Sequence, residues 1–491
     1  MTLKKRTLRN LGAVAGAQIV AVSLGQISIL FLAHILDTED FGLYAIVFVV
    51  YTIVMILATG GIDQASIQSK EEENKILSTG RSLRGLITGA VILFLIAFAP
   101  LISASFERPN LTEPLRLTTI ALLFSYLSFA SFVRLSRKLK FAQISMARVV
   151  YAVVWPIAAL AGAVAGLDYW SLVLALILAY AASSLMLIYY EHRSIPMELD
   201  KKLAKGLLRY GEYVLASGLA YYLMLNLDKI VIGIFLAEGT LGVYFLAYSW
   251  GTAVPNLFTN VANTVMFPTY THITEDKETL RKAYARTFTY SAYLSIPIGI
   301  GLAAIAGFFV KGVLGPEWSA ASVPLAILSI GGMMYSLLSP ASNLFLATGH
   351  PELVWRQTMM MFVPSVLLVV PMVVYLGIDG AALLMMAVAT LSLVWTTWKS
   401  SRLLEIPTSS LPKSILRPTL AALAMGIATF GLSLVLPASV GWVVVLILGG
   451  MIVYLALVIA LTKGSILRDM REIIQLLRSR KDLEDVDLAS P

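Results

Sequence analysis

Apolar stretches about as long as a membrane is thick recur along the whole chain, and they constrain its fold more than any other feature. Each runs for roughly 20 residues, the length at which an α-helix crosses about 30 Å of hydrocarbon. Of the 491 residues, 58% are hydrophobic and only 13% are charged. A soluble protein of this length needs far more polar surface. The stretches lack the two-residue alternation of barrel strands, so the sequence predicts an all-α integral membrane protein.

The pattern predicts fourteen transmembrane helices, an even number that places both chain ends on one side of the membrane. The predicted spans are 11–36, 41–66, 83–105, 115–134, 146–166, 169–190, 211–236, 240–267, 287–311, 321–347, 354–376, 380–399, 416–436 and 441–462.

The basic residues test this topology, because cytoplasmic loops are rich in lysine and arginine. Thirty-three of the 37 basic residues fall on the side of the N-terminus, and Arg108, Arg116 and Lys311 fall on the other. The distribution indicates a multi-pass protein of the cell (inner or plasma) membrane with cytoplasmic N- and C-termini. It also accounts for the net charge of +8 without a nucleic-acid partner. One basic residue remains unexplained, Lys229 within predicted helix 7.

Two segments recur at a nearly constant offset. Residues 36–44 resemble residues 236–244, an offset of 200, and Gly166-Leu-Asp168 resembles Gly377-Ile-Asp379, an offset of 211. These matches predict two parallel six-helix repeats, helices 1–6 and 7–12, that form two lobes around a central cavity. The predicted organisation is an N-lobe (1–195), an amphipathic cytoplasmic linker (196–210), a C-lobe (211–405), helices 13–14 (406–463) and a cytoplasmic amphipathic helix with an acidic tail (464–491).

Asp228 and Lys229 lie side by side in the apolar sequence of helix 7. A lysine at depth costs about 2.5–3.5 kcal/mol to insert. Lys229 either reaches the outer interface with its long side chain or offers a fixed positive charge to a phosphate or acidic sugar. Adjacent helical residues diverge by about 100°, so we expect Asp228 to face away from Lys229. Asp228 either binds a coupling cation, Na⁺ or H⁺, or pairs with a polar neighbour.

Helix 8 carries a polar stripe at helical spacing, and helix 1 carries a weaker one that includes Gln26. Such stripes either line a cavity that binds sugar hydroxyls or join helices by hydrogen bonds. The helix 8 stripe consists of Ser249, Thr252, Asn256, Asn260 and Asn263.

Arg148 and Arg356 begin helices 5 and 11, near-equivalent places in the two repeats. They either anchor the helices at the cytoplasmic interface or reach the mouth of the cavity and meet a diphosphate. The sequence contains no cysteine, no phosphate-binding Gly-Lys-Ser/Thr loop, no metal-ligand cluster and no nucleophile–base pair. We therefore expect no enzyme activity and no cofactor, with transport driven by an ion gradient or by the gradient of the substrate.

Several motifs resemble the Wzx-type polysaccharide and O-antigen flippases of the multidrug/oligosaccharidyl-lipid/polysaccharide exporter superfamily. They are Leu227-Asp-Lys229, Gly242–Trp250, Met266-Phe-Pro268, Leu280–Tyr284, Gly315–Trp318, Leu346–Pro351 and Gly377–Ala381. The resemblance implies alternating access through a cavity lined by helices 1, 2, 7 and 8. The implied cargo is a polyprenyl diphosphate-linked oligosaccharide, moved from the cytoplasmic to the outer leaflet for surface polysaccharide assembly.

The related lipid II flippases carry arginines along their first two helices, and this chain has none there, which favours a mainly neutral cargo. The resemblance also implies a sodium site at an acid of helix 7, for which Asp228 is the matching position. Implied partners are membrane lipids and the glycosyltransferases or polymerase of the same pathway. The alternative function is a cation-coupled multidrug-type exporter, although the extra helices 13–14 favour a lipid-linked cargo. A polysaccharide polymerase or other membrane enzyme would need large outer loops, which the sequence lacks.

Overall fold

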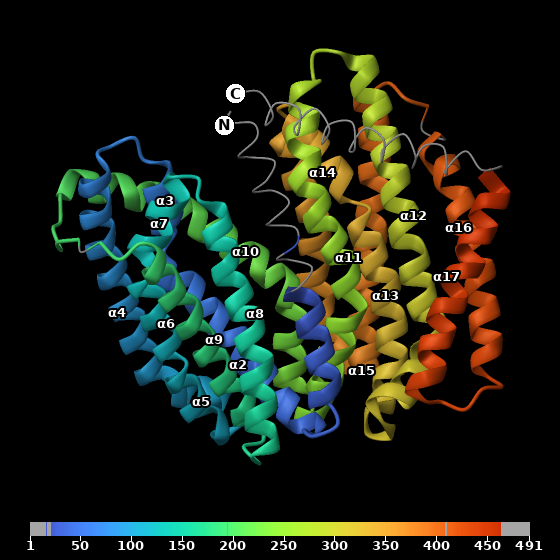
Figure 1. The fold of residues 1–491 in the computed structure, drawn as a ribbon, viewed down its shortest axis with the longest axis horizontal. Coiled ribbons are helices and arrows are strands. Elements are labelled where there is room, and N and C mark those ends of the chain that lie inside the picture. Colours follow the sequence, from blue (N-terminus) through green and yellow to red (C-terminus); the bar gives the residue numbers. More distant parts are fainter. Residues whose placement is uncertain (1–15, 17–20, 194, 408–409, 463–491) are drawn as a thin grey trace, which may run out of the picture.

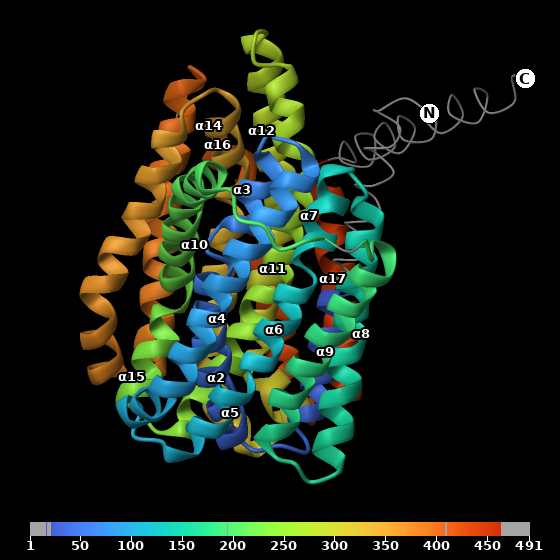
Figure 2. The same ribbon diagram turned by 90° about the vertical axis from the view of Figure 1, so that its left-hand side faces the viewer.

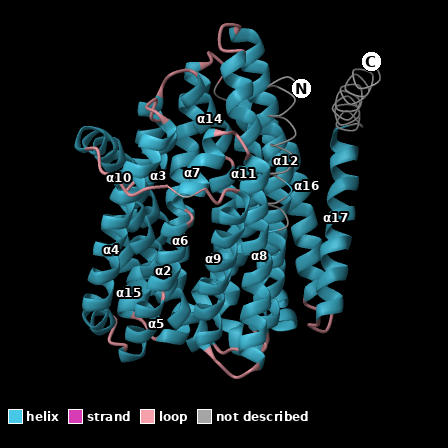
Figure 3. Cartoon of the chain, turned by 60° about the vertical axis from the view of Figure 1, so that its left-hand side comes forward, coloured by secondary structure: helices cyan, strands magenta, loops and turns pink. Residues whose placement is uncertain are grey.

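The computed structural model describes residues 16, 21–193, 195–407 and 410–462, without the side chains of 238, 254–265, 267, 268, 272 and 412–414. Helices and loops account for all of this part, and no strand is present in it (Figure 3). The predicted all-α architecture is confirmed. The predicted tail helix, 464–491, lies outside the described residues.

Two groups of helices make up the described chain. The first contains the helical segment Ala21–Leu32, α2 (Thr38–Thr59), α3 (Ile62–Gln68), α4 (Glu73–Ser105), η1 (Pro109–Leu111), α5 (Thr112–Leu117), α6 (Thr119–Leu127), α7 (Phe129–Arg137), α8 (Phe141–Val164) and α9 (Tyr169–Tyr190). The second contains α10 (Lys201–Phe235), α11 (Glu238–His272), α12 (Lys277–Phe309), η2 (Val310–Leu314), η3 (Pro316–Ala321), α13 (Ser322–Ser336), α14 (Ser339–Ala347), α15 (Pro351–Leu403), α16 (Ser410–Ser433) and α17 (Val440–Thr462).

By length and composition, ten helices of the described part could cross a membrane, or eleven if the bent pair Pro109–Leu127 and Phe129–Arg137 forms one span. The chain is thus a multi-pass membrane protein. Predicted helices 11 and 12 both lie within α15, which is interrupted at Gly377 by a left-handed φ of 61°. The total of fourteen stays a prediction.

Figure 1 shows two lobes, α2–α9 on one side and α11–α15 on the other, with α16 and α17 packed outside the second. α10 begins beside α3 of the first lobe and runs past α2 to α15 of the second. The loops rich in lysine and arginine lie at the upper end of this view, which we call the basic end. The lobes diverge toward it and converge at the other end, which we call the opposite end. In Figure 2 the first lobe faces the viewer, and α15 lies at the left edge of the view.

The predicted linker 196–210 is not a separate element. Residues 201–210 form the first turns of α10, a continuous helix that begins at the N-cap Asp200, whose carboxylate accepts the Leu203 amide at 2.8 Å. The sequence between Lys201 and Phe235 contains no proline, so nothing ends the helix at the predicted boundary.

A break divides predicted helix 2 into α2 and α3. Gly60 and Gly61 both adopt left-handed φ values, 53° and 68°, which glycine reaches without strain. Gly61 also faces Gly211 of α10 so closely that a Cβ on Gly61 would collide with the Gly211 backbone. The glycines therefore allow α10 to cross the end of α2 backbone to backbone.

The guanidinium of Arg84 holds this break together. Arg84 lies eleven residues into α4 with its side chain 1% exposed, so it is not the loop anchor that its position in the sequence suggested. It donates to Asp63 of α3 at 3.2 Å, to Ser125 of α6 at 3.2 Å and to the Ala58 carbonyl at the end of α2. One side chain thus joins four helices of the N-lobe.

A second charged network lies at the basic end of the N-lobe. Arg134 contacts Glu73 at 2.9 Å and Glu191 at 3.3 Å, and Lys138 contacts Glu191 at 3.3 Å. Burial alone would raise the pKa of Glu191, but the hydrogen bond and charge of Lys138, together with Arg134 and Arg193, hold it below its usual value. The network ties the start of α4 and the ends of α7 and α9 into one unit.

We predict that Arg84→Met lowers the thermal denaturation midpoint of the purified protein. It leaves Asp63 without its partner, and removing one member of a buried ion pair costs about 3–5 kcal/mol. Arg116→Met is the matched control, because its pair with Glu113 is solvent-exposed and contributes roughly 0–1 kcal/mol. Equal shifts for the two variants would contradict this account of the α2–α3 break.

Candidate functional site

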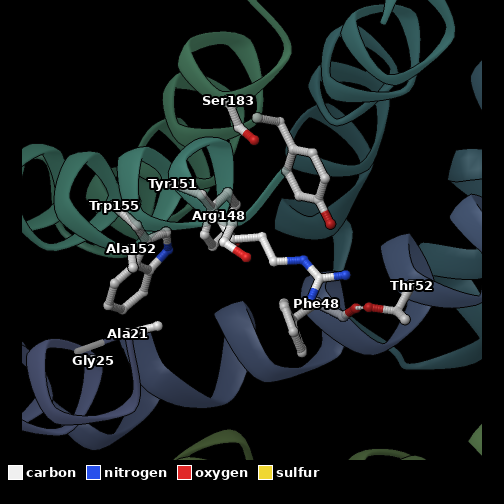
Figure 4. A pocket seen from close by; sticks show the side chains of 11 residues that line it. Ala21, Gly25, Phe48, Thr52, Arg148, Tyr151, Ala152, Trp155 and Ser183 are labelled. Atoms are coloured by element: carbon white, nitrogen blue, oxygen red, sulfur yellow. Dashed lines mark hydrogen bonds between the residues drawn. The ribbon is translucent and has the colours of Figure 1, made fainter. Parts of the chain in front are cut away.

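The N-lobe contains a cavity with a volume of about 650 Å³ that opens between helix 1, α2, α8 and α9 (Figure 4). This volume lies within the roughly 300–1,000 Å³ of ligand-binding pockets. The lining residues are Ala21, Gly25, Phe48, Thr52, Ser145, Arg148, Tyr151, Ala152, Trp155, Tyr180 and Ser183. The wall is thus aromatic and hydroxylated, with a single charged group.

Arg148 supplies that charge. It lies seven residues into α8, about 10 Å along the helix from the basic end. Figure 4 shows its guanidinium pointing across the cavity toward Phe48 and Thr52 of α2. The side chain is exposed and has no hydrogen bond or ion pair with any residue that the structure describes.

The C-lobe contains a smaller cavity of about 230 Å³. Its lining residues are Tyr221, Leu225, Tyr248, Thr252, Leu328, Gly331, Gly332, Tyr335, Met361, Met385 and Ala389. The four members from α10 and α11 correspond one by one to N-lobe lining residues at the offset of the sequence repeat. Subtracting 200 from 221, 225, 248 and 252 gives Ala21, Gly25, Phe48 and Thr52. The two cavities are therefore equivalent features of the two repeats.

The sequence explains why the equivalent cavities differ in size. Helix 1 presents Ala21 and Gly25 to the N-lobe cavity, whereas α10 presents Tyr221 and Leu225 to the C-lobe cavity. Tyr221 also approaches Tyr335 with its hydroxyl, at an oxygen–oxygen distance of 3.2 Å, which closes that side further. Large side chains thus fill the C-lobe cavity, and small ones leave the N-lobe cavity open.

Lys229 and Asp228 lie behind the C-lobe cavity and are both buried. The Lys229 Nζ lies 3.5 Å from Asp228 Oδ1 and 3.3 Å from the centre of the Tyr248 ring, and it donates to the Leu225 carbonyl at 3.2 Å. The Tyr244 hydroxyl donates to Asp228 Oδ2 at 2.6 Å. Charge pairing and the ring face together stabilise the buried ammonium.

Two expectations about this pair are wrong. Asp228 does not face away from Lys229, because the flexible lysine stem folds back along the helix to the carboxylate. Lys229 does not reach the outer interface, since it is 3% exposed and covered by Tyr248. Of the two alternatives for Asp228, the pairing with a polar neighbour is present in this structure, with Tyr244, and the binding of a coupling cation stays a prediction.

The lobes contact each other at the opposite end. Trp318 of η3 donates its indole N–H to the Ala33 carbonyl at 3.0 Å and packs edge-on against Phe41 of α2, with ring centres 5.2 Å apart. Arg108 donates to the Leu236 carbonyl at 2.9 Å. Both hydrogen bonds cross from one lobe to the other.

Glycines bring α2 and α11 into direct backbone contact at this end. A Cβ on Gly242 would collide with the Thr38 carbonyl and lie 2.9 Å from the Gly42 nitrogen. Gly42 and Gly242 are themselves equivalent at the offset of 200, so the two repeats meet at equivalent residues. We call the contacts of Thr38, Phe41, Arg108, Gly242 and Trp318 the opposite-end closure.

The other predicted site residues are dispersed. Thr252 lines the C-lobe cavity, and its hydroxyl donates to the Tyr248 carbonyl at 2.7 Å. Ser249, Gln26 and Arg356 line neither cavity, and Arg356 is exposed at the basic end. Gln26 nevertheless keeps a buried side-chain oxygen that has no hydrogen-bond partner in the described part of the chain. The side chains of Asn256, Asn260 and Asn263 lie outside those described.

The sequence reasoning missed the aromatic wall of the N-lobe cavity, Phe48, Tyr151, Trp155 and Tyr180. A position-by-position comparison of the repeats would have indicated the open space beside this wall, because Ala21 and Gly25 stand where the second repeat has Tyr221 and Leu225. Of the two alternatives for Arg148, the structure places its side chain at the N-lobe cavity.

The fold and the paired cavities are those of a multi-pass membrane transporter. Residues 31–323 match the family described as "Polysaccharide biosynthesis protein", and the chain belongs to this family. The chain is 25% identical over 405 residues to "Lipopolysaccharide biosynthesis protein WzxC" of Escherichia coli (strain K12), covering 80% of each chain. It is 27% identical to "Teichuronic acid biosynthesis protein TuaB" of Bacillus subtilis (strain 168), covering 76% of this chain and 78% of TuaB.

Solved structures share the fold. "Lipid II flippase MurJ, inward closed conformation" superposes with a TM-score of 0.76 at 16% identity, covering 94% of this chain and 100% of that one. A multidrug resistance MATE family transporter in an inward-facing conformation gives 0.63 at 14% identity, covering 83% of this chain and 99% of that one. These relatives are transporters rather than catalysts. Within the described residues no group of three or more His, Asp or Glu side chains could hold a metal ion.

We predict that Gly25→Leu, which copies the C-lobe residue, reduces transport severalfold by filling the N-lobe cavity. A Cβ at Gly25 meets nothing within 4 Å, so the protein should fold normally. Gly89→Leu on α4 is the control, because a Cβ there also meets open space but outside the cavity. Transport by both variants is compared at equal expression in the membrane, and undiminished transport by Gly25→Leu would contradict a role for the cavity.

Proposed function

We propose that this protein translocates a polyprenyl diphosphate-linked oligosaccharide from the cytoplasmic to the outer leaflet of the cell membrane, for surface polysaccharide or glycan assembly. The observation that carries the proposal is the ligand-sized, aromatic-lined cavity of the N-lobe, in a pair of lobes that contact each other at the opposite end. The family, and relatives named for lipopolysaccharide and teichuronic acid biosynthesis, support a saccharide cargo. A relative that matches 42% of this chain is named "Probable low-salt glycan biosynthesis flippase Agl15", from Haloferax volcanii. Its name supports a flippase function with a glycan cargo.

The proposed orientation places the basic end and both termini in the cytoplasm. The distribution of lysine and arginine supports it, since cytoplasmic loops retain positive charge. The N-lobe cavity then faces the leaflet in which a cytoplasmic precursor would be made. Membrane lipids, and the glycosyltransferases or polymerase of the same pathway, are the proposed partners.

Transport requires the opposite-end closure to part while the basic end closes. Rigid rocking of two lobes around a central site is the usual mechanism for repeat-built transporters. The closure contains two interlobe hydrogen bonds and a ring contact, each contributing roughly 0.5–1.5 kcal/mol, beside apolar side chains of both lobes that share one buried core. We propose that the binding energy of cargo or of a coupling ion shifts the balance between this closure and contacts formed at the basic end.

Asp228 is our candidate for coupling and Lys229 for cargo binding. A cation or proton at Asp228 would replace the Lys229 ammonium, now 3.5 Å from its carboxylate. The released lysine could then swing past Tyr248 into the C-lobe cavity and bind an anionic group of the cargo. We further propose Arg148, Arg356, Gln26, Ser249, Thr252, Asn256, Asn260 and Asn263 as cargo-binding residues.

A cation-coupled multidrug exporter is the second candidate, because the fold also superposes on MATE transporters. The two are separated in proteoliposomes that contain the purified full-length chain. We expect flipping of a fluorescent lipid-linked oligosaccharide, measured by quenching of the label in the outer leaflet. Proton-driven efflux of a cationic dye without glycan flipping would favour the second candidate.

We predict that Lys229→Gln lowers the flipping rate about tenfold or more, because Asp228 and any anionic cargo group lose their buried partner. Asp228→Asn should remove the dependence of flipping on the coupling ion, measured by exchanging Na⁺ for K⁺ and by varying pH. Ion dependence that survives in Asp228→Asn would exclude coupling at this residue. Lys311→Gln, at an exposed lysine, controls for the loss of one positive charge.

We predict that a Thr38→Cys/Gly239→Cys disulfide arrests transport by locking the opposite-end closure. A Cβ on Gly239 would lie 3.4 Å from that of Thr38, close to the spacing of natural disulfides. The chain has no cysteine of its own, so each single variant is a clean control. Oxidation should stop flipping and a reducing agent should restore it. Full flipping by the quantitatively cross-linked protein would exclude this closure as a gate.

A further inference from the structure

Arg148 differs from three other charges of the bundle in having no counter-charge among the described residues. Lys229 pairs with Asp228, Arg84 with Asp63, and Arg134 with Glu73 and Glu191. Arg148 has no carboxylate partner among the residues that the structure describes. Its guanidinium lies about 10 Å along α8 from the basic end, exposed to the open N-lobe cavity and not to a loop surface.

The surroundings of Arg148 fit an anion that carries a flat apolar face. Tyr151 and Trp155 follow Arg148 on α8 at intervals of three and four residues, so they lie on the same side of the helix. Tyr180 holds Tyr151 edge-on, with ring centres 5.1 Å apart. Ring faces carry partial negative charge and attract the C–H groups of a pyranose, whereas a guanidinium binds carboxylate or phosphate with two parallel hydrogen bonds.

The repeat shows that this arrangement belongs to the N-lobe alone. Among the described residues, none that lines the C-lobe cavity is charged, and Tyr221 and Leu225 occupy the space that Ala21 and Gly25 leave free. The absence of arginine from helices 1 and 2 led us to expect a mainly neutral cargo. The structure instead brings a cation from helix 5 to the same cavity.

We propose that the N-lobe cavity is a subsite for a sugar bearing an anionic group, and that Arg148 is the residue selecting for that charge. This inference rests on the proposed function and deepens it by naming the chemical class of the cargo. The anionic group is either a carboxylate on the sugar ring or the phosphate that joins the sugar to its lipid. Trp155 and Tyr151 supply the surface against which the ring packs.

Binding is tested with the purified full-length chain in detergent, by isothermal titration calorimetry with three probes: methyl glucuronide, methyl glucoside and inorganic diphosphate. We expect at least one anionic probe to bind more tightly than the glucoside. Arg148→Gln should weaken that probe roughly tenfold or more, the loss expected for a charge-assisted hydrogen bond, and leave the glucoside unchanged. Arg148→Lys should recover part of the affinity. Gly25→Leu should abolish binding of the same anionic probe, which locates the probe in this cavity.

The outcomes identify the source of the charge. Arg148-dependent binding of the glucuronide assigns the subsite to an acidic sugar, and Arg148-dependent binding of diphosphate alone assigns it to the lipid-linking phosphate. Equal binding of all three probes, or anion binding that Arg148→Gln leaves intact, would overturn the proposal. The flipping assay is independent of these measurements. Failure to flip a lipid-linked glycan while Arg148-dependent anion binding persists would contradict the proposed function and not this subsite.

Discussion

The backbone contact of α2 with α11 at Gly42 and Gly242 is the constraint on which the rest of the structure depends. The two glycines occupy equivalent positions in the repeat, so they mark where the pseudo-symmetry axis passes between the lobes. Without side chains at this point, the helices approach closely enough for Trp318 to reach the Ala33 carbonyl. The convergence of the lobes at the opposite end, and their divergence toward the basic end, both follow from this crossing.

The two repeats share the same helical framework but differ in the size and charge of their cavities. The same helix positions line a cavity in each lobe, and small residues at 21 and 25 open one while large residues at 221 and 225 fill the other. The charges follow the same division. The N-lobe presents Arg148, which has no charged partner among the described residues, whereas in the C-lobe Lys229 packs against Asp228 and Tyr248. The two lobes therefore differ in charge as well as in the size of their cavities.

Hydropathy and repeats predicted the helical class and the two lobes, because these depend on composition and spacing. They could not predict the position of the charged group at the tip of a long side chain. Lysine has four rotatable methylene groups, so Lys229 folds back to the carboxylate that helical geometry alone would separate from it. Arg84 looked like a loop anchor because helix 3 begins ten residues earlier than its apolar core. The aromatic wall around Arg148 comes from three segments that are distant in sequence, and only the packing of α2, α8 and α9 brings them together.

Distances between the lobes at both ends of the bundle test the central claim most directly. The absence of native cysteine allows spin-label pairs at Gln68 and Glu275 near the basic end, and at Leu167 and Ser319 near the opposite end. Pulsed electron paramagnetic resonance in lipid nanodiscs would measure both distances with and without a lipid-linked oligosaccharide. The account predicts opposite changes, with the basic-end distance shortening in the same fraction of molecules in which the opposite-end distance lengthens. Distances that change in the same direction at both ends, or stay constant in a protein that flips cargo, would contradict it.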